Sequence, residues 1–435
     1  MLSLLGGLTH PNNAQAQKVK STPFSYLPEQ GADRYDMRVP RKTLPLADGS
    51  GFVILAHQSS GSYSVERYDA DLKKQWSTTI PINPGETVEA FGRGTQQALV
   101  VLHHKDDNGQ NLTLVPVNLQ GGQKAAPKVL MAVAPRDRRP GVSISPDGSR
   151  VLAFRYFTRE QQVKSMAATL FDQSGNKIEE KNYDFRALGD FFSPAVHVAN
   201  DGTQYVTLIS EGMKKLTVRR YPTGPSTEIK VLGVPVGGVF GGKTVTVRDA
   251  KFTVLGDGSL YAAAICADYA TGEYYSLKVV RFDFSGSGDM KFSPEFRFTP
   301  EYLAEVAKAG GVEAKRLEDI YLADLLLTPD KQLVVIGERH FEVWQRSARA
   351  RPRVAPVWLQ RVWRAHLAQH CGQRPSSPGR GRLHRHRLPG RGVWQYRAAA
   401  HAGESQQKVG PLPAARQRAD RRGKSSRTAQ AERGR

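Results

Sequence analysis

The feature that most constrains the fold of this chain is a tight Asp-Gly turn, or a near equivalent, between alternating strands from about residue 42 to 343. The turn acids Asp48, Asp147, Asp201 and Asp257 are separated by 99, 54 and 56 residues, and the first spacing equals two units of about 50. Glycine accepts the positive φ that such turns require, and aspartate bonds to its own backbone. A period near 50, built from strands without intervening helices, is typical of β-propeller blades.

The repeat divides residues 34–343 into six visible blades, of which the last is incomplete. The blades start near residues 46, 88, 141, 195, 249 and 319. Second strands such as VLAF (151–154) and YAAAICA (261–267) carry small or β-branched apolar residues, which suit a strand covered on both faces. We therefore predict an all-β fold: a β-propeller with about six blades, a short helical insertion and a disordered C-terminal tail. Residues 34–46 could close the ring by completing the last blade.

The helical insertion is expected at residues 299–318, where the spacing of the turn acids becomes irregular. Asp257 and Asp330 are 73 residues apart, which exceeds the other intervals by about 20. Thr299 suits an N-cap, Pro300 the first helical position, and Glu301 the first turn. Gly310 and Gly311 then break or end the helix.

Two segments carry a resemblance to known proteins. SISPDGSRVLAF (143–154) resembles the repeat of TolB-like and related bacterial propellers, in which S-P-D-G precedes an apolar strand. YDADLKKQWSTTI (68–80) is similar to the outer-strand hairpin of propeller repeats in exported bacterial proteins. The resemblance extends over about 300 residues at the level of architecture. It implies the fold and no catalytic residues.

Residues 1–17 look like the latter part of a secretory signal peptide. The apolar run LSLLGGL (2–8) is followed by Ala14-Gln15-Ala16, an A-x-A pattern, although no basic residue precedes the run. The expected location is therefore exported, whether periplasmic, cell-surface or secreted; the alternative is a frayed, mildly apolar tail. No apolar stretch of about 18 residues exists, so the sequence predicts no membrane-spanning helix.

The net charge of +21 is concentrated in residues 345–435, which carry 22 basic and three acidic residues, a net +19. Residues 1–344 keep 40 basic and 38 acidic residues, a net +2. Arginine replaces lysine in this Arg-rich tail, and the change falls inside the last blade. We interpret residues 345–435 as disordered, out-of-frame translation after a frameshift in a GC-rich gene. The alternative is a basic arm that binds nucleic acid, with aromatic residues such as Trp358 and Trp394 stacking on bases.

One segment matches the phosphate-binding pattern G-x-x-x-x-G-K-[ST], through Gly237, Gly242, Lys243 and Thr244. A phosphate-binding loop must open a helix, whose first N–H groups hold the phosphates. Here the next residues are VTVRDAKFTVL, an alternating, β-branched run that predicts a strand. We interpret the match as chance and expect no nucleotide or other cofactor.

Metal and catalytic motifs give no firm candidate. His103 and His104 are adjacent on a strand and point to opposite faces, so they cannot hold one metal ion together. The tail cluster of His366, His370 and Cys371 fits no standard zinc spacing. We therefore expect no metal site. No G-x-S-x-G or H-E-x-x-H motif occurs. Residues at blade starts that could converge on a central mouth, or equally link the blades, are Arg139, Arg248, Asp249, Asp319 and Tyr321.

Together these features predict an exported, monomeric propeller that acts as a non-enzymatic binding scaffold for a protein or glycan. The alternative is a propeller hydrolase or lyase whose residues converge at the central channel. A third hypothesis, nucleic-acid binding through the basic tail, depends wholly on residues 345–435, and we do not expect nucleic acid as the partner.

Overall fold

A computed structural model describes residues 41–345 and 353–365, together with positions 21, 22, 27 and 39. Gaps in the first range fall at 160–161, 189–190, 226–227, 286–287, 293–294, 303, 305–319 and 328–332. Several predicted features therefore lie outside the described residues: the signal-like segment 1–17, most of the helical insertion with Gly310 and Gly311, Asp319, the turn at Asp330, and residues 366–435 of the tail.

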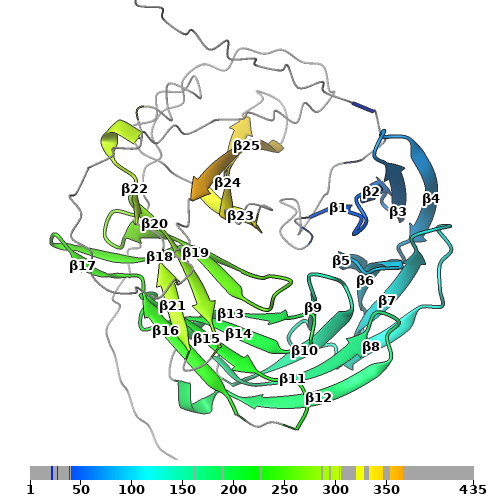
Figure 1. Cartoon of the computed structure of the whole chain (residues 1–435), viewed down its shortest axis with the longest axis horizontal. Helices are drawn as coiled ribbons and strands as arrows, with labels where there is room; N and C mark the ends of the chain where they lie inside the picture. Colours follow the sequence, from blue (N-terminus) through cyan, green and yellow to red (C-terminus); the bar gives the residue numbers. More distant parts are fainter. Residues whose placement is uncertain are drawn as a thin grey trace, which may run out of the picture. The chain divides into compact units, whose positions relative to one another are not determined.

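The described residues form six antiparallel sheets that follow one another along the chain (Figure 1). The first contains β1 (Thr43–Pro45), β2 (Gly51–Ser59), β3 (Ser62–Asp69) and β4 (Lys74–Pro81). The second contains β5 (Glu86–Arg93), β6 (Gln97–Lys105), β7 (Gln110–Asn118) and β8 (Lys128–Val133). The third contains β9 (Gly141–Ile144), β10 (Arg150–Arg159), β11 (Gln162–Asp172) and β12 (Lys177–Asp184), followed by the 3-10 helix η2 (Arg186–Leu188).

The fourth sheet contains β13 (Phe191–Val198), β14 (Gln204–Ser210), β15 (Lys215–Tyr221) and β16 (Lys230–Pro235). The fifth contains β17 (Gly238–Phe240), β18 (Lys243–Val254), β19 (Leu260–Asp268), β20 (Tyr274–Asp283), β21 (Asp289–Phe292) and β22 (Phe296–Arg297). The sixth contains β23 (Ile320–Leu327), β24 (Leu333–Gln345) and β25 (Arg353–Ala365). This series of antiparallel sheets is a β-propeller, and the predicted fold class is confirmed.

Each pair of consecutive sheets shares a core of buried apolar side chains. The sheets meet, for example, through Leu55 and Val100, Leu114 and Phe171, Leu152 and Val206, Val218 and Leu260, and Val279 and Leu322. Central strands are covered on both faces, and every residue of β19 is buried. The small residues of YAAAICA therefore follow from the close approach of two neighbouring sheets.

A salt bridge joins the sixth sheet to the chain just before β1. Nε and Nη2 of Arg41 both donate to the carboxylate of Asp324 at 2.5 Å, and Nη2 also donates to the carbonyl of Leu325 at 3.0 Å. β1 pairs with β2, with Thr43 opposite Ile54. It is therefore an edge strand of the first sheet. Most of the segment 34–46 that was predicted to complete the last blade, namely residues 34–38 and 40, lies outside the described residues.

The predicted start of the helical insertion is present, whereas part of the predicted tail forms a strand. Residues 300–302 are helical, and Oγ1 of Thr299 accepts a hydrogen bond from the N–H of Tyr302 at 3.3 Å, as expected of an N-cap.

β25 falls inside the segment that we interpreted as tail, and it pairs with β24 from Leu333↔Ala365 to Gln345↔Arg353. The described elements belong to one compact unit. Among them, no helix has the length and apolar character needed to span a bilayer.

Candidate binding groove

The segment with the phosphate-loop pattern forms a β-hairpin. β17 and β18 pair with Phe240 opposite Lys243, and Gly241 and Gly242 make the two-residue turn with φ of +56° and +79°. Positive φ at both positions is the signature of a type I′ hairpin turn. Lys243 lies at 3.5 Å from the carboxylate of Glu273. Residues 238–254 are thus strand and turn, whereas phosphate binding by this pattern needs a helix N-terminus.

The candidate mouth residues take part in contacts between neighbouring sheets. Arg139 donates to Oε2 of Glu89 at 2.5 Å and to the hydroxyl of Thr87 at 2.8 Å, linking β5 of the second sheet to the connection that leads into the third sheet. The carboxylate of Asp249 accepts from the backbone N–H of Leu322 at 2.7 Å, linking the fifth and sixth. These two candidates therefore lie at different interfaces, and each has a partner.

Arg248 and Tyr321 flank the contact between Asp249 and Leu322, one on each of the two strands that meet there. Arg248 is exposed at a bulge of β18, between Val247 and Asp249, and Tyr321 is exposed on β23. A bulge redirects a side chain away from the regular alternation of the strand, which explains why Arg248 and Asp249 diverge in burial.

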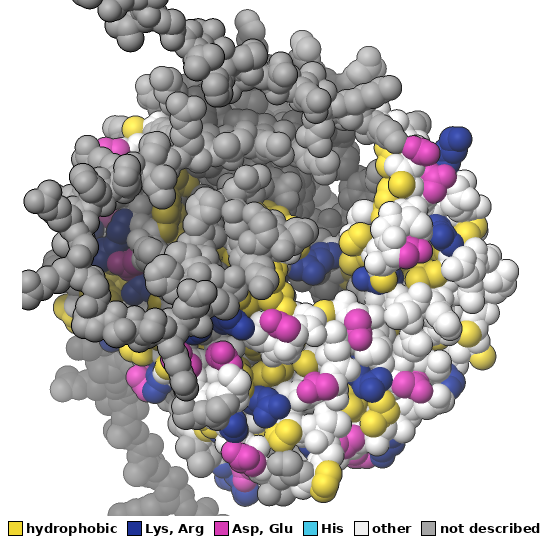
Figure 2. Space-filling model, in the orientation of Figure 1, with side chains coloured by type: hydrophobic (Ala, Val, Ile, Leu, Met, Phe, Trp, Pro, Cys, Tyr) yellow, Lys and Arg dark blue, Asp and Glu magenta, His cyan; other side chains and the backbone are white. Residues whose placement is uncertain are grey.

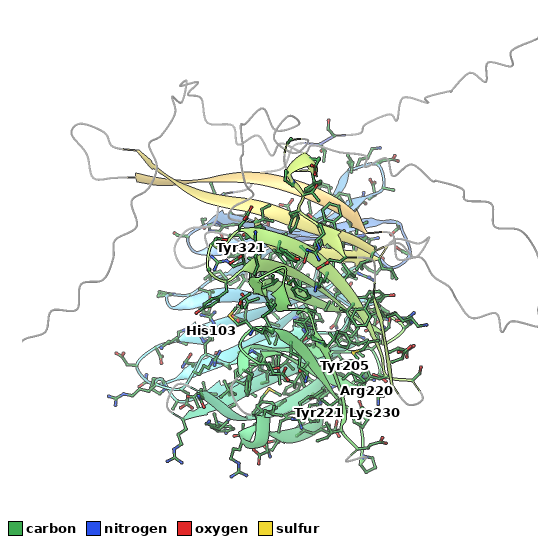
Figure 3. The ribbon with its side chains drawn as sticks, turned by 90° about the vertical axis from the view of Figure 1, so that its left-hand side faces the viewer. His103, Tyr205, Arg220, Tyr221, Lys230 and Tyr321 are labelled. Atoms are coloured by element: carbon green, nitrogen blue, oxygen red, sulfur yellow. The ribbon has the colours of Figure 1, made fainter. Side chains whose placement is uncertain are left out.

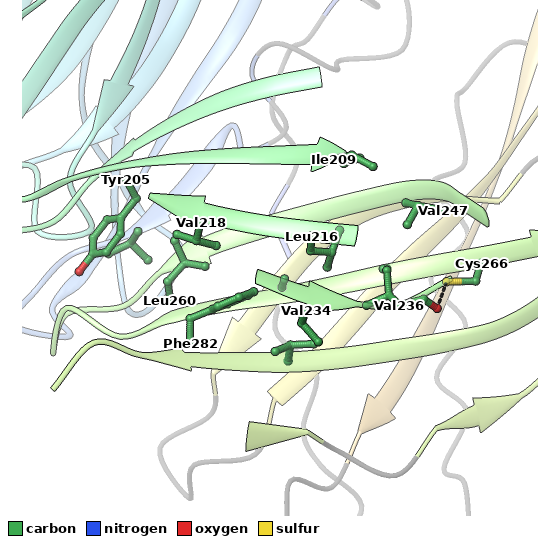
Figure 4. Packing of buried hydrophobic residues seen from close by; sticks show 14 of the residues in the cluster. Tyr205, Ile209, Leu216, Val218, Val234, Val236, Val247, Leu260, Cys266 and Phe282 are labelled. Atoms are coloured by element: carbon green, nitrogen blue, oxygen red, sulfur yellow. Dashed lines mark hydrogen bonds between the residues drawn. The ribbon is translucent and has the colours of Figure 1, made fainter. Parts of the chain in front are cut away.

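Of two groups capable of chemistry, one lies in a core between sheets and the other is partly buried. Cys266 is fully buried, its Sγ donates to the carbonyl of Val236 at 3.6 Å, and burial raises the pKa of the thiol to about 12 (Figure 4). Burial lowers the pKa of His197 to about 4, with a smaller contribution from Lys251. Among the described residues, no group of three or more His, Cys, Asp or Glu side chains is arranged to hold a metal ion.

A groove of about 740 Å³ lies between the third and fourth sheets. One wall is the outermost strand of the third sheet, from Glu179 to Asp184 on β12. The other wall contains Arg219 and Tyr221 of β15 and the chain between β15 and β16, including Pro222, Gly224, Pro225, Glu228 and Ile229. Figure 3 labels Tyr221 of this second wall on β15, and Lys230 at the start of β16, just after the wall's last residue Ile229.

Contacts across the groove hold its two walls together. Oε1 of Glu179 accepts from the ammonium of Lys181 at 3.1 Å and from the backbone N–H of Gly224 at 3.1 Å. The ammonium of Lys181 also donates to the carbonyl of Pro222. Because these side chains bond to backbone groups of the opposite wall, the spacing between the third and fourth sheets is set at this point.

The floor of the groove is aromatic. The rings of Tyr183 and Tyr221 meet edge to face with centroids 4.3 Å apart, and the hydroxyl of Tyr183 donates to Oε1 of Gln204. Burial raises the pKa of both tyrosine hydroxyls, so they remain neutral at physiological pH. At the open end, the Arg186 guanidinium lowers the pKa of Asp184 to about 2, so Asp184 is charged.

Sequence reasoning missed this groove. KIEEKNYD (177–184) reads as an ordinary outer strand, and nothing in its pattern marks it as different from other outer strands. The one available signal was the Pro222–Pro225 segment, because two prolines within a short connection predict a rigid loop beside the neighbouring blade.

Comparisons with known proteins identify no family. No family model matches the chain, and no curated protein matches it. TolB from Acinetobacter baumannii is 13% identical, with 74% of this chain and 60% of TolB covered and a TM-score of 0.34. Prolyl oligopeptidase B from Galerina marginata is 12% identical, with 74% of this chain and 46% of the peptidase covered and a TM-score of 0.40. Synechocystis apocarotenoid oxygenase is 12% identical, with 68% of this chain and 65% of the oxygenase covered and a TM-score of 0.36. At these TM-scores the fold assignment stands on the six sheets themselves.

Proposed function

We propose that this chain is an exported β-propeller that acts as a non-enzymatic binding scaffold for a protein or glycan, with the groove between the third and fourth sheets as its binding site. The observation that carries the proposal is the groove itself. It is open, it has a polar wall on each side, and its walls are held in place by contacts between two sheets. Pre-formed concave sites on a rigid scaffold are the usual sites of ligand binding.

The distribution of reactive groups favours binding over catalysis. Cys266 is buried, His197 is only partly exposed, and Arg139 and Asp249 are bonded to neighbouring segments. A hydrolase or lyase needs acid and base groups that converge on one open site. On the face shown in Figure 2, acidic and basic side chains of the described residues are interspersed, which gives no single-sign surface for a polyanion such as nucleic acid.

The test is to fill the groove and measure binding by the full chain. Asn182→Trp places an indole on the exposed edge of β12, within the groove lining. Thr79→Trp places the same ring at an exposed position of β4, the corresponding outer strand of the first sheet, and is the matched control. Panels of immobilised peptides and of glycans serve as probes.

We expect the unmodified chain and Thr79→Trp to bind the same member of a panel, and Asn182→Trp to lose that binding. Equal binding by both variants would show that the groove is not the site. Turnover of chromogenic ester, peptide or glycoside substrates by the chain would overturn the non-enzymatic assignment in favour of the hydrolase or lyase.

A further inference from the structure

The two faces of the sixth sheet are packed to different degrees. In the register of β23 and β24, Leu325 lies opposite Val335 and Leu326 lies opposite Val334, so the two pairs point to opposite faces. Leu325 and Val335 are buried in the core shared with the fifth sheet. On the other face Leu326 is 40% exposed and Val334 is half-buried. β24 is a central strand, as β19 is in the fifth sheet, yet every residue of β19 is buried.

The loosely packed face of the sixth sheet is the one that meets the chain just before β1. Asp324 shares this face, because it lies opposite Ile336, which is also half-buried. The carboxylate of Asp324 accepts two hydrogen bonds from the Arg41 guanidinium, each at 2.5 Å. The side chain of Arg41 is 44% exposed and that of Asp324 is 16% exposed, so solvent ions reach this ion pair.

The first sheet has a small core of its own on the face that points away from the second sheet. Leu55 belongs to the core shared with the second sheet, so its neighbour Ile54 points to the opposite face. Ile54, Ala56 and Tyr68 are buried there, and Phe52 packs against them. No described residue of the sixth sheet belongs to this cluster. Among the described residues, the first and sixth sheets are therefore joined by an ion pair and not by a shared apolar core.

A charged group is buried on the same face of the first sheet. Glu66 lies opposite Ile54 in the register of β2 and β3, and it is 3% exposed. Its carboxylate accepts from the hydroxyl of Tyr68 at 2.6 Å and from the ammonium of Lys74 at 3.0 Å. Polar groups regain water when an interface opens, so an interface that contains them separates at a lower cost than an apolar one of the same area.

Polar contacts fasten the sixth sheet to the fifth, in addition to their shared core. The N–H of Leu322 donates to the carboxylate of Asp249 at 2.7 Å. The hydroxyl of Tyr274 accepts from the N–H of Ile320 at 3.0 Å and donates to the carbonyl of the same residue at 3.1 Å. Both the apolar core and these bonds hold the sixth sheet to the fifth, so a separation is expected at the first sheet.

We propose that the propeller opens reversibly at the interface between its first and sixth sheets, the seam, and that the Arg41–Asp324 ion pair is the latch that keeps the seam closed. Salt screens a partly exposed guanidinium–carboxylate pair, so the opening increases with ionic strength. Opening at the seam gives a ligand a side entrance between β1 and β23 (Figure 1). This entrance is separate from the groove between the third and fourth sheets.

The experiment measures thiol labelling at two adjacent positions of β2 in the full chain. Ile54→Cys places a thiol on the seam side of the first sheet, and Leu55→Cys places one in the core shared with the second sheet. Peptide mass mapping separates both from Cys266 and Cys371. Because local opening exposes only the seam side, we expect Ile54→Cys to be labelled at least about tenfold faster than Leu55→Cys. Cys266 reports complete unfolding in the same sample.

The latch is tested by removing its charge. Arg41→Met keeps the aliphatic stem, and we expect it to speed the labelling of Ile54→Cys about tenfold and to leave Leu55→Cys unchanged. Arg139→Met is the matched control, because it removes the ion pair with Glu89 elsewhere in the propeller. It should leave the labelling of Ile54→Cys unchanged.

A salt series tests the latch without any change to Arg41. Raising the salt from about 0.1 M to about 1 M shortens the Debye length from about 10 Å to about 3 Å. We expect this to speed the labelling of Ile54→Cys in the chain with Arg41 and not in the chain with Arg41→Met. Circular dichroism reports whether Arg41→Met is folded; if it is not, the salt series with Arg41 in place decides.

The possible outcomes are distinct. Equal labelling rates for Ile54→Cys and Leu55→Cys overturn the opening of the seam. An equal effect of Arg41→Met and Arg139→Met, or faster labelling of both β2 thiols in Arg41→Met, shows a general loss of stability and overturns the latch. None of these results bears on ligand binding in the groove, which the Asn182→Trp comparison tests.

Discussion

Two glycines at equivalent positions of the repeat provide a direct test of how neighbouring sheets are packed. Gly148 follows Asp147 in the turn between β9 and β10, and Gly258 follows Asp257 in the turn between β18 and β19. Their φ values are +70° and +78°. Replacing either by alanine places a Cβ in a left-handed conformation, which costs roughly 1–2 kcal/mol in each case.

The two sites differ in what the added Cβ meets. At Gly258 nothing lies within 4 Å. At Gly148 the Cβ would be 2.3 Å from the carbonyl oxygen of Arg93 and 2.5 Å from the backbone nitrogen of Gly94. These are backbone atoms of the second sheet and cannot rotate aside, so the sheets must separate, at a further cost of about 1–3 kcal/mol. We expect Gly258→Ala to destabilise the protein by roughly 1–2 kcal/mol and Gly148→Ala by about 2–5 kcal/mol.

The measurement is urea-induced unfolding of both variants followed by circular dichroism. Gly258→Ala is the matched control, because it contains the same backbone strain without the clash. If the two variants differ by less than about 0.5 kcal/mol, the turn of the third sheet does not press on the second and the packing argument is wrong.

Three further predictions concern buried polar groups. Nε2 of Gln110 donates to the carbonyl of Asp137 at 2.8 Å, and its Oε1 contacts the His103 ring at 3.1 Å. Because Gln110→Leu leaves these partners unsatisfied, it should lower the free energy of unfolding in urea by about 1–3 kcal/mol. A change near zero would refute this. Burial raises the pKa of Glu66, but hydrogen bonds from Tyr68 and Lys74 outweigh it and leave the pKa below its usual range. Glu66 thus contributes stability above the unfolded-state pKa, which is lost as pH falls through the folded-state pKa, and Glu66→Gln should flatten the acid side of the stability profile. Cys266 should react with a thiol reagent only as fast as the protein unfolds, and rapid labelling of that thiol in the native state would contradict its burial.

The fold was predictable because its signal is local and repeated. Each Asp-Gly turn, with a strand on either side, can be recognised within about 20 residues, and the small residues of β19 show that it is covered on both faces. The helix start at Thr299 and Pro300 is equally local. β25 was not expected, because we based the end of the propeller on composition, and an arginine-rich segment can still pair with β24 through its backbone.

The groove was not predictable for a physical reason. It needs β12 and the chain after Tyr221 to lie beside each other, and that depends on how two separate sheets pack. Alternation predicts which side chains of a strand share a face and says nothing about which segment of another sheet that face will meet. For the candidates Arg139 and Asp249, sequence reasoning left two roles open, and the structure places both residues in contacts between sheets.

The salt bridge between Arg41 and Asp324 cannot form until both residues have been synthesised. The two residues are 283 positions apart. At typical elongation rates, Asp324 emerges roughly 15–60 s after Arg41. Throughout that interval one flank of the first sheet has no neighbour, because its partner has not yet been translated. The first sheet of the nascent chain is therefore exposed on that flank while the rest of the chain is synthesised, and exposed strands of this kind aggregate. A chaperone that recognises apolar strands would have its greatest effect on the first sheet during this interval.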